Sequence, residues 1–100
     1  MVRHLILWKL KESLTVEEKH TVLQDMKEQL EGLVGRVPGL VSLNIVINEM
    51  ESSNADVMLD SVLESEDALK AYQSHPDHVT VANTYVRPFT EVRMCLDYKA

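Results

Sequence analysis

The sequence predicts an α+β domain in which two strand–helix–strand halves share one four-stranded antiparallel sheet. Three observations predict this class. The chain has 100 residues, which suits a single domain over residues 1–100. Its apolar segments follow the order strand, helix, strand, strand, helix, strand. Only the short polar stretch Glu49–Asn54 separates the two central strands, so they are expected to form an antiparallel hairpin.

The first strand is expected over Val2–Leu10, where large apolar side chains alternate onto both faces. One face carries Val2, His4, Ile6, Trp8 and Leu10, and the other carries Arg3, Leu5, Leu7 and Lys9. A strand covered on one side only would alternate apolar with polar residues. Both sides of this sheet therefore need cover.

The first helix is expected to begin after Thr15. Thr15 and Glu18 have the spacing of a capping box, in which each side chain binds the other residue's backbone amide. An apolar stripe at helical spacing follows: Val16, Leu23, Met26, Leu30, Leu33 and Val37. Gly35 and Pro38–Gly39 are expected to end the helix.

The central hairpin is expected to pair Leu40–Asn48 with Asp56–Leu63. Apolar residues share one face of each strand: Val41, Leu43, Ile45 and Ile47 in one, and Val57, Leu59 and Leu63 with Ser61 in the other. Asp60 has the opposite phase, so we expect it to face the helices. A buried carboxylate needs a partner, and His20 or a lysine of the first helix is the candidate.

The second helix is expected to follow a Ser65 cap and to end before Pro76, because the residue before a proline is biased away from helix. Its buried side carries Ala68, Leu69, Ala71 and Tyr72. Pro76 is suited to the first position of a short third helix that runs to about Tyr85. The last strand is expected over Phe89–Tyr98.

This order is the ferredoxin-like, or split βαβ, arrangement, in which the helices cover one sheet face. We expect the uncovered face to carry His4, Ile6, Trp8, Val57 and Leu59. Soluble monomers rarely tolerate so large an apolar patch, and two-fold pairing is its commonest cover. A homodimer through the open sheet face is therefore predicted, as a dimeric α+β barrel with a ligand space between the sheets.

The composition of the chain excludes several classes of function. The net charge of −6 and the scattered basic residues argue against nucleic-acid and anionic-membrane surfaces. No apolar run approaches the length of a membrane span, and residues 1–10 lack the features of a signal peptide, so a cytoplasmic protein is expected. The single cysteine, Cys95, excludes an intrachain disulfide and a cysteine-based metal site, and is expected to be a small buried hydrophobe.

The distinctive motif is Tyr72-Gln73-Ser74-His75-Pro76-Asp77-His78. With the opening Val2-Arg3-His4, the Val37-Pro38-Gly39-Leu40 turn and Arg87-Pro88-Phe89, it resembles the stress-responsive A/B barrel domain (Dabb) family of the dimeric α+β barrel superfamily. The resemblance covers essentially the whole chain. It implies a homodimer with a pocket between sheet and helices, and an association of the plant members with stress tolerance.

The resemblance extends, more distantly, to the plant polyketide cyclase that forms olivetolic acid. It implies that His78 acts as a general base, that Tyr72 hydrogen-bonds the substrate and that His4 lies in the pocket. Imidazole can accept a proton from carbon beside a carbonyl near neutral pH, and a phenol can stabilise the enolate, so no cofactor is expected. Val57 replaces a pocket histidine of the cyclase and Trp8 is expected to point into the cavity, so the pocket should be smaller and more apolar.

The expected site therefore combines candidate catalytic residues with apolar lining. The candidates are His78, Tyr72 and His4, and the lining is Ile6, Trp8, Val57, Leu59 and His75. Three functions remain open: binding of a small hydrophobic, aromatic or carbonyl ligand; cofactor-independent cyclase, isomerase or monooxygenase chemistry; and a purely structural assembly.

Tyr72, His4, His75 and His78 also have non-catalytic alternatives, and for His78 the alternative is a position that only lines the pocket. His75 is placed to cap the next helix, and Tyr72 and His4 are residue types that pack in a core with satisfied polar atoms. His75 and His78 are too few to hold a transition metal, and Pro76 breaks the helix that would align them, so no metal site is expected. A magnesium ion held by backbone carbonyls, known in some family members, leaves no sequence trace.

Overall fold

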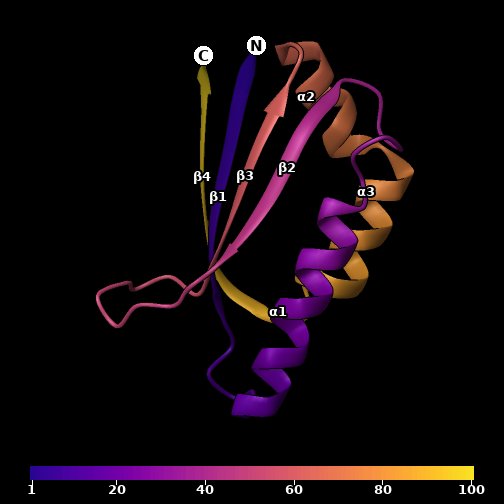
Figure 1. The fold of residues 1–100 in the computed structure, drawn as a ribbon. Coiled ribbons are helices and arrows are strands. Elements are labelled where there is room, and N and C mark those ends of the chain that lie inside the picture. The colour runs from indigo at the N-terminus through magenta and orange to yellow at the C-terminus, as the bar shows by residue number, and fades with distance from the viewer.

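A computed structural model describes residues 1–100. Strand β1 (Val2–Leu10) leads to helix α1 (Val16–Glu31), and β2 (Leu40–Ile47) and β3 (Val57–Leu63) follow. Helices α2 (Glu66–Ser74) and α3 (Pro76–Val81), the π-helix η1 (Ala82–Val86) and strand β4 (Thr90–Lys99) complete the chain. All helices lie on one side of the sheet, and nothing covers the other side (Figure 1).

The sheet has the strand order β2-β3-β1-β4, and all neighbouring pairs are antiparallel. The predicted ferredoxin-like α+β fold is therefore confirmed. The two terminal strands lie side by side, and both chain ends lie at the same end of the sheet (Figure 1). This pairing brings residues from the two ends of the sequence onto one surface.

Local capping signals hold the helices where the sequence placed them. Thr15 and Glu18 form the predicted capping box, and the Ser65 hydroxyl accepts from the amide of Ala68. Pro76 occupies the first turn of α3, where its missing amide hydrogen costs nothing. The predicted third helix changes to a π-helix at Ala82, where the Arg87 amide bonds the Ala82 carbonyl five residues back.

Helix α1 is shorter than its apolar stripe. It ends at Glu31. Leu33 and Val37 lie in the turns that follow the helix, and their side chains are buried in the core. Val16, by contrast, is 83 % exposed at the first helical position. The stripe thus marked most of the core residues correctly, but spacing alone could not distinguish the last helical turn from the loop that packs behind it.

The expectation for the uncovered sheet face is wrong. The face with His4, Ile6, Trp8, Val57 and Leu59 is buried beneath the chain's own helices. The open face is the opposite one and includes Leu5, Leu7, Val46, Met58, Val62, Val92, Met94, Leu96 and Tyr98. Because β1 is apolar on both faces, its alternation could not tell which face the helices choose.

The position of Asp60 is corrected for the same reason. Asp60 lies on the open face, not beneath the helices, and its carboxylate binds the guanidinium of Arg3 through two hydrogen bonds of 3.1 and 3.0 Å. Neither His20 nor a helix lysine is its partner. A polar pair thus lies within an otherwise largely apolar surface.

The outer edge of β2 is protected by helix α1. The Lys27 ammonium donates to the Ile45 carbonyl over 3.0 Å, and the Glu31 carboxylate accepts from the Ile45 amide over 2.9 Å. These side chains occupy backbone groups that an exposed edge would offer to another strand. The open face, and not this edge, is therefore the main unpartnered surface of the sheet.

Candidate ligand-binding site

A small cavity lies between the sheet and the segment from α2 to β4. Its volume is about 80 Å³. Sheet residues Ile6, Trp8 and Leu59 line one side. The other lining residues are Leu30, Tyr72, His78, Ala82, Val86, Arg87, Thr90 and Arg93. The cavity therefore forms within one chain and does not require a second sheet, which corrects the expectation that dimerisation creates it.

Tyr72 is the most unusual group in this cavity. It comes from the last turn of α2, is 1 % exposed, and its hydroxyl has no hydrogen-bond partner. Burial raises the pKa of the Tyr72 phenol well above its ordinary value. The hydroxyl therefore keeps its proton at neutral pH and is available as a donor to an oxygen atom in the cavity.

His78 lies beside Tyr72, at the third residue of α3. The two ring centroids are 4.3 Å apart, with 43° between the ring planes. The His78 Nδ1 atom lies 3.2 Å from the Gln73 carbonyl oxygen. A carbonyl can only accept, so Nδ1 carries the proton and Nε2 is the basic nitrogen.

Burial lowers the pKa of His78 from its ordinary value, and the positive charges of Arg87 and Arg93 lower it further. The Gln73 hydrogen bond opposes this effect in part. His78 is therefore neutral near pH 7. A neutral imidazole with a free Nε2 can accept a proton or a hydrogen bond from a ligand.

His4 approaches the site from β1. It is 1 % exposed, and its ring meets that of Tyr72 edge-on, with 6.3 Å between centroids. Its Nδ1 atom is in short hydrogen-bond contact with the Asp97 carboxylate on β4. His4 is not among the residues that line the cavity, so it is a neighbour of Tyr72 and not part of the wall.

The other expected site residues are divided between this cavity and other roles. Ile6, Trp8 and Leu59 are in the wall, whereas Val57 and His75 are not. The His75 Nδ1 atom accepts from the Asp77 amide over 3.1 Å, so its side chain caps α3. This is the structural alternative expected from its position before Pro76.

Sequence reasoning missed the two arginines and the π-helix. Arg87 and Arg93 line the cavity, and η1 contributes Ala82 and Val86 to its wall. Arg87-Pro88-Phe89 was a visible motif, but only the tertiary structure shows that its arginine reaches the cavity. π-Helical turns are often found at functional sites.

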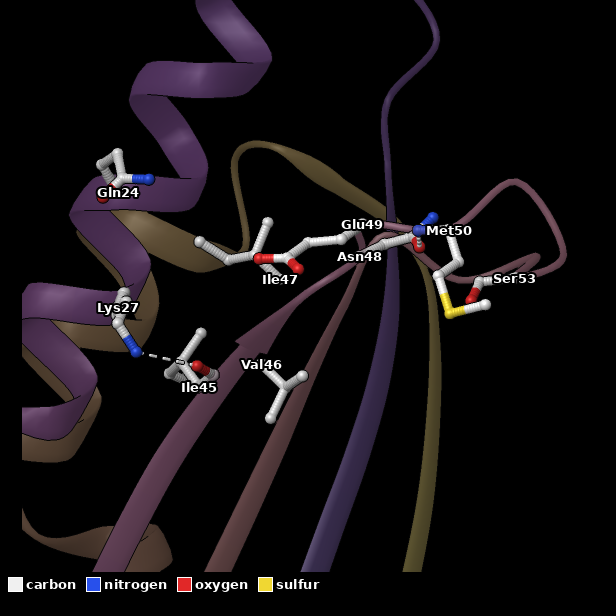
Figure 2. Close-up of a pocket in the computed structure, with 9 residues that line it drawn as sticks. All are labelled: Gln24, Lys27, Ile45, Val46, Ile47, Asn48, Glu49, Met50 and Ser53. Carbon is white, nitrogen blue, oxygen red and sulfur yellow. Dashed lines mark hydrogen bonds between the residues drawn. The ribbon is translucent and has the colours of Figure 1, made fainter.

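A larger surface groove lies at the far edge of the sheet. It measures about 640 Å³, and Figure 2 shows α1 on one side of β2 and the loop with Met50 and Ser53 on the other. Lys27, its one cationic group, is already bound to Glu31 and to the Ile45 carbonyl. The groove therefore offers less chemistry than the smaller cavity at Tyr72.

Together, the fold and this cavity define a ferredoxin-like α+β domain with a small pocket between sheet and helices. The family model of the stress-responsive A/B barrel domain (Dabb) matches residues 2–100, so the chain belongs to that family. No curated protein matches the chain. No helix combines the length and the apolar character that a membrane crossing requires.

Solved structures with the same fold have different reported roles. A dimeric ferredoxin-like protein of unknown function from Bacteroides fragilis is 29% identical, with a TM-score of 0.93 and coverage of 99% of this chain and 95% of that one. A hydroxynitrile lyase from Passiflora edulis is 16% identical, with a TM-score of 0.73 and coverage of 97% and 90%. A putative antibiotic biosynthesis monooxygenase from Nitrosomonas europaea is 13% identical, with a TM-score of 0.76 and coverage of 100% and 98%.

Proposed function

We propose that this protein binds a small, mainly apolar ligand with one carbonyl or hydroxyl oxygen, in the cavity at Tyr72. The unpartnered Tyr72 hydroxyl supports this proposal most directly. A buried hydroxyl without a hydrogen bond is unfavourable by about 1–3 kcal/mol, and an oxygen of the ligand would remove that penalty. The apolar side chains of Ile6, Trp8 and Leu59 would contact the rest of the ligand.

The size of the cavity limits the ligand. Drug-sized ligands occupy pockets of about 300–1,000 Å³, whereas this cavity measures about 80 Å³. We therefore expect a ligand of a few non-hydrogen atoms, such as a short-chain aldehyde, ketone or carboxylic acid. A bulky aromatic compound would require Trp8 or the α3–η1 segment to move.

Ligand binding is tested with Trp8, the only tryptophan, as a fluorescent reporter in the cavity wall. Short-chain aldehydes, ketones and acids are titrated into the protein, and saturable changes in emission are expected. Tyr72→Phe should weaken binding, whereas Tyr85→Phe, outside this cavity, should leave it unchanged. Equal affinity of the wild-type protein and Tyr72→Phe for every ligand would contradict the proposal.

We also propose that two copies pair through the open sheet face. That face is rich in apolar side chains, and Met94 and Leu96 on β4 are 66% and 62% exposed in the single chain. The loop between β2 and β3 extends beyond this face, on the side away from the helices (Figure 1). The dimeric description of the Bacteroides fragilis protein, which is similar over nearly the whole chain, supports this pairing.

The dimer is tested by light scattering at micromolar concentration. Leu96→Glu places a charge on the open face and should yield monomers, because an unpaired charge in an apolar interface is strongly unfavourable. Val16→Glu, on the exposed start of α1, is the matched control and should remain dimeric. A monomeric wild-type protein, or a Leu96→Glu variant that remains dimeric, would contradict the proposed interface.

Base catalysis is the second candidate function. In this scheme the His78 Nε2 atom removes a proton from carbon next to a carbonyl, and the Tyr72 hydroxyl donates to the enolate oxygen. The free Nε2 and the lowered pKa of His78 favour it. The scheme requires no cofactor, and it suits cyclisation or isomerisation of a carbonyl compound.

Catalysis is tested by exchange of the α-protons of short ketones with deuterated water, followed by NMR. The wild-type protein should accelerate exchange, and His78→Gln should abolish the acceleration. His20→Gln, on the exposed side of α1, is the control. Binding without any accelerated exchange would leave ligand binding as the function and exclude this chemistry for these substrates.

A further inference from the structure

A second cluster of reactive side chains lies on the same face of the sheet, outside the cavity. His4 on β1 pairs directly with Asp97 on β4, and Cys95 occupies the next position of β4 on that face, opposite Ile6. One ligand atom from each of the three side chains lies within 4.8 Å of the other two. An imidazole, a thiol and a carboxylate are the three side-chain groups that Zn²⁺ binds most often.

The two distances from the Cys95 sulfur to His4 and Asp97 match those around a shared metal ion. Around tetrahedral Zn²⁺, a sulfur lies about 3.5 Å from a nitrogen or oxygen ligand. The Cys95 Sγ atom lies 3.7 Å from His4 Nδ1 and 3.5 Å from Asp97 Oδ1. His4 and Asp97 are hydrogen-bonded and closer than two ligands of one ion, but the side chain of Asp97 is 38% exposed and can turn outward.

We propose that His4, Cys95 and Asp97 form a binding site for a divalent transition-metal ion, with Zn²⁺ as the expected ion. His4 Nδ1, Cys95 Sγ and Asp97 Oδ1 provide three ligands, and a water molecule from solvent completes the tetrahedron. Cys95 gives its thiol proton to solvent when the bond to the metal forms. The resulting thiolate and carboxylate together neutralise the two charges of the ion.

The position of the cluster lets a metal ion reach it from solvent and holds one of its proposed ligands rigidly. His4 is almost fully buried and held by its strand, whereas Cys95 and Asp97 are exposed on the edge strand. The expectation that Cys95 is a small buried hydrophobe is therefore wrong. The exclusion of a cysteine-based metal site considered Cys95 alone, whereas the fold places it beside His4 and Asp97. Figure 1 shows β4 at the margin of the sheet, away from the helices. The cluster also lies on the side of the sheet opposite to the open face, so a partner on that face leaves it accessible.

Two features oppose binding and are included in the design of the test. Asp97 already serves His4 as a hydrogen-bond acceptor, so the cluster has a second explanation in which Asp97 only orients the imidazole. Burial and the negative charge of Asp97 raise the pKa of the Cys95 thiol, which disfavours the thiolate, and the positive charge of Arg93 offsets this only in part. A metal site and an orienting pair differ in the role of Cys95, which an orienting pair does not need.

The test uses Co²⁺ as a spectroscopic substitute for Zn²⁺, with the reduced, chelator-treated protein. Wild-type protein should show a saturable thiolate-to-cobalt absorption band with one ion per chain, and Zn²⁺ should abolish it. Cys95→Ser should lose the band. Loss of a residue that only supports a metal ligand typically weakens metal binding by roughly 10–100-fold. Asp97→Asn removes a proposed ligand and should therefore weaken binding by at least as much. His20→Gln should bind as the wild-type protein does.

Several results would overturn the proposal. A wild-type protein without the thiolate band has no such site. Binding that survives in Cys95→Ser with unchanged affinity belongs to other residues. A band that Asp97→Asn leaves unchanged, or that appears only as larger oligomers form, would indicate bridging of exposed cysteines between molecules. Both variants change exposed side chains and are expected to fold. Circular dichroism verifies this. The result is independent of the ligand proposed for the cavity.

Discussion

The rings of Tyr72 and His78 lie 4.3 Å apart, centroid to centroid, although the two residues belong to different helices. Pro76 makes this contact possible, because it ends one helix and begins the next between them. One ring carries a buried hydroxyl without a partner, and the other carries a free basic nitrogen. A donor and an acceptor thus lie together beside one small cavity.

Tyr72→Phe is expected to stabilise the ligand-free protein by about 1 kcal/mol, because it removes a buried hydroxyl that has no hydrogen bond. Chemical denaturation at fixed protein concentration measures the change, since a dimer's stability depends on concentration. Tyr85→Phe, where the ring is partly exposed, should change the free energy of unfolding much less. A clear loss of stability in Tyr72→Phe would show that the hydroxyl has a partner, such as a bound water.

The stability of the protein is expected to fall as the pH drops below the ordinary pKa of histidine, in part because of His78. The pKa of His78 is lower in the folded protein than in the unfolded chain. As the pH falls, the unfolded chain therefore binds a proton at a higher pH than the folded protein does, and this shifts the equilibrium toward unfolding. The contribution is complete above the unfolded pKa of about 6.5 and is lost as the pH falls through the folded value. His78→Gln should flatten the slope of unfolding free energy against pH in that window, whereas His20→Gln should flatten it less. Equal slopes in the wild-type protein and His78→Gln would contradict this.

Arg3→Gln is expected to weaken the dimer more than it destabilises the folded chain. The pair of Arg3 and Asp60 is partly exposed in one chain, where such pairs contribute little. In the proposed dimer the same pair is covered, so removal of Arg3 leaves a buried carboxylate without its partner. Sedimentation at several concentrations measures the dimer. The double variant Arg3→Gln with Asp60→Asn should recover part of the loss. Lys27→Gln is the control, because its partly exposed pair with Glu31 lies at the β2 edge and not on the open face.

Trp8→Leu is expected to enlarge the cavity and to change its ligand preference toward larger aromatic and branched compounds. Trp8 is 5% exposed and forms part of the wall. Truncation of such a residue to alanine destabilises a core by about 3–5 kcal/mol, and leucine should cost less. Thermal shift assays with a graded series of ketones measure both effects. An unchanged size preference would show that Trp8 does not limit the ligand.

Gly39→Ala is expected to destabilise the protein more than Gly35→Ala does. Both glycines have positive φ, 83° and 88°, a conformation that costs other residues about 1–2 kcal/mol. A β-carbon added at Gly39 would also lie 2.7 Å from the Ala68 β-carbon, whereas a β-carbon added at Gly35 would have no atom of another residue within 4 Å, apart from its two chain neighbours. The difference in free energy of unfolding between the two variants measures this contact. Equal losses would contradict the close approach of this turn to α2.

Part of the candidate site was visible in the sequence. Tyr72, His75 and His78 lie within one short motif, and the proline inside it predicts the break between two helices. The cluster of His4, Cys95 and Asp97 was not visible, because no local pattern joins residues from opposite ends of the chain. Only the pairing of β1 with β4 brings them together.

The sequence by itself determined the order of the elements, the helix caps at Thr15 and Ser65, and therefore the ferredoxin-like class. Those features depend on local periodicity and on hydrogen bonds between residues a few positions apart. The tertiary structure alone decided which face of β1 the helices cover, and with it the partner of Asp60 and the position of the cavity. That choice depends on how all the apolar surfaces pack together, and a strand that is apolar on both faces leaves it open.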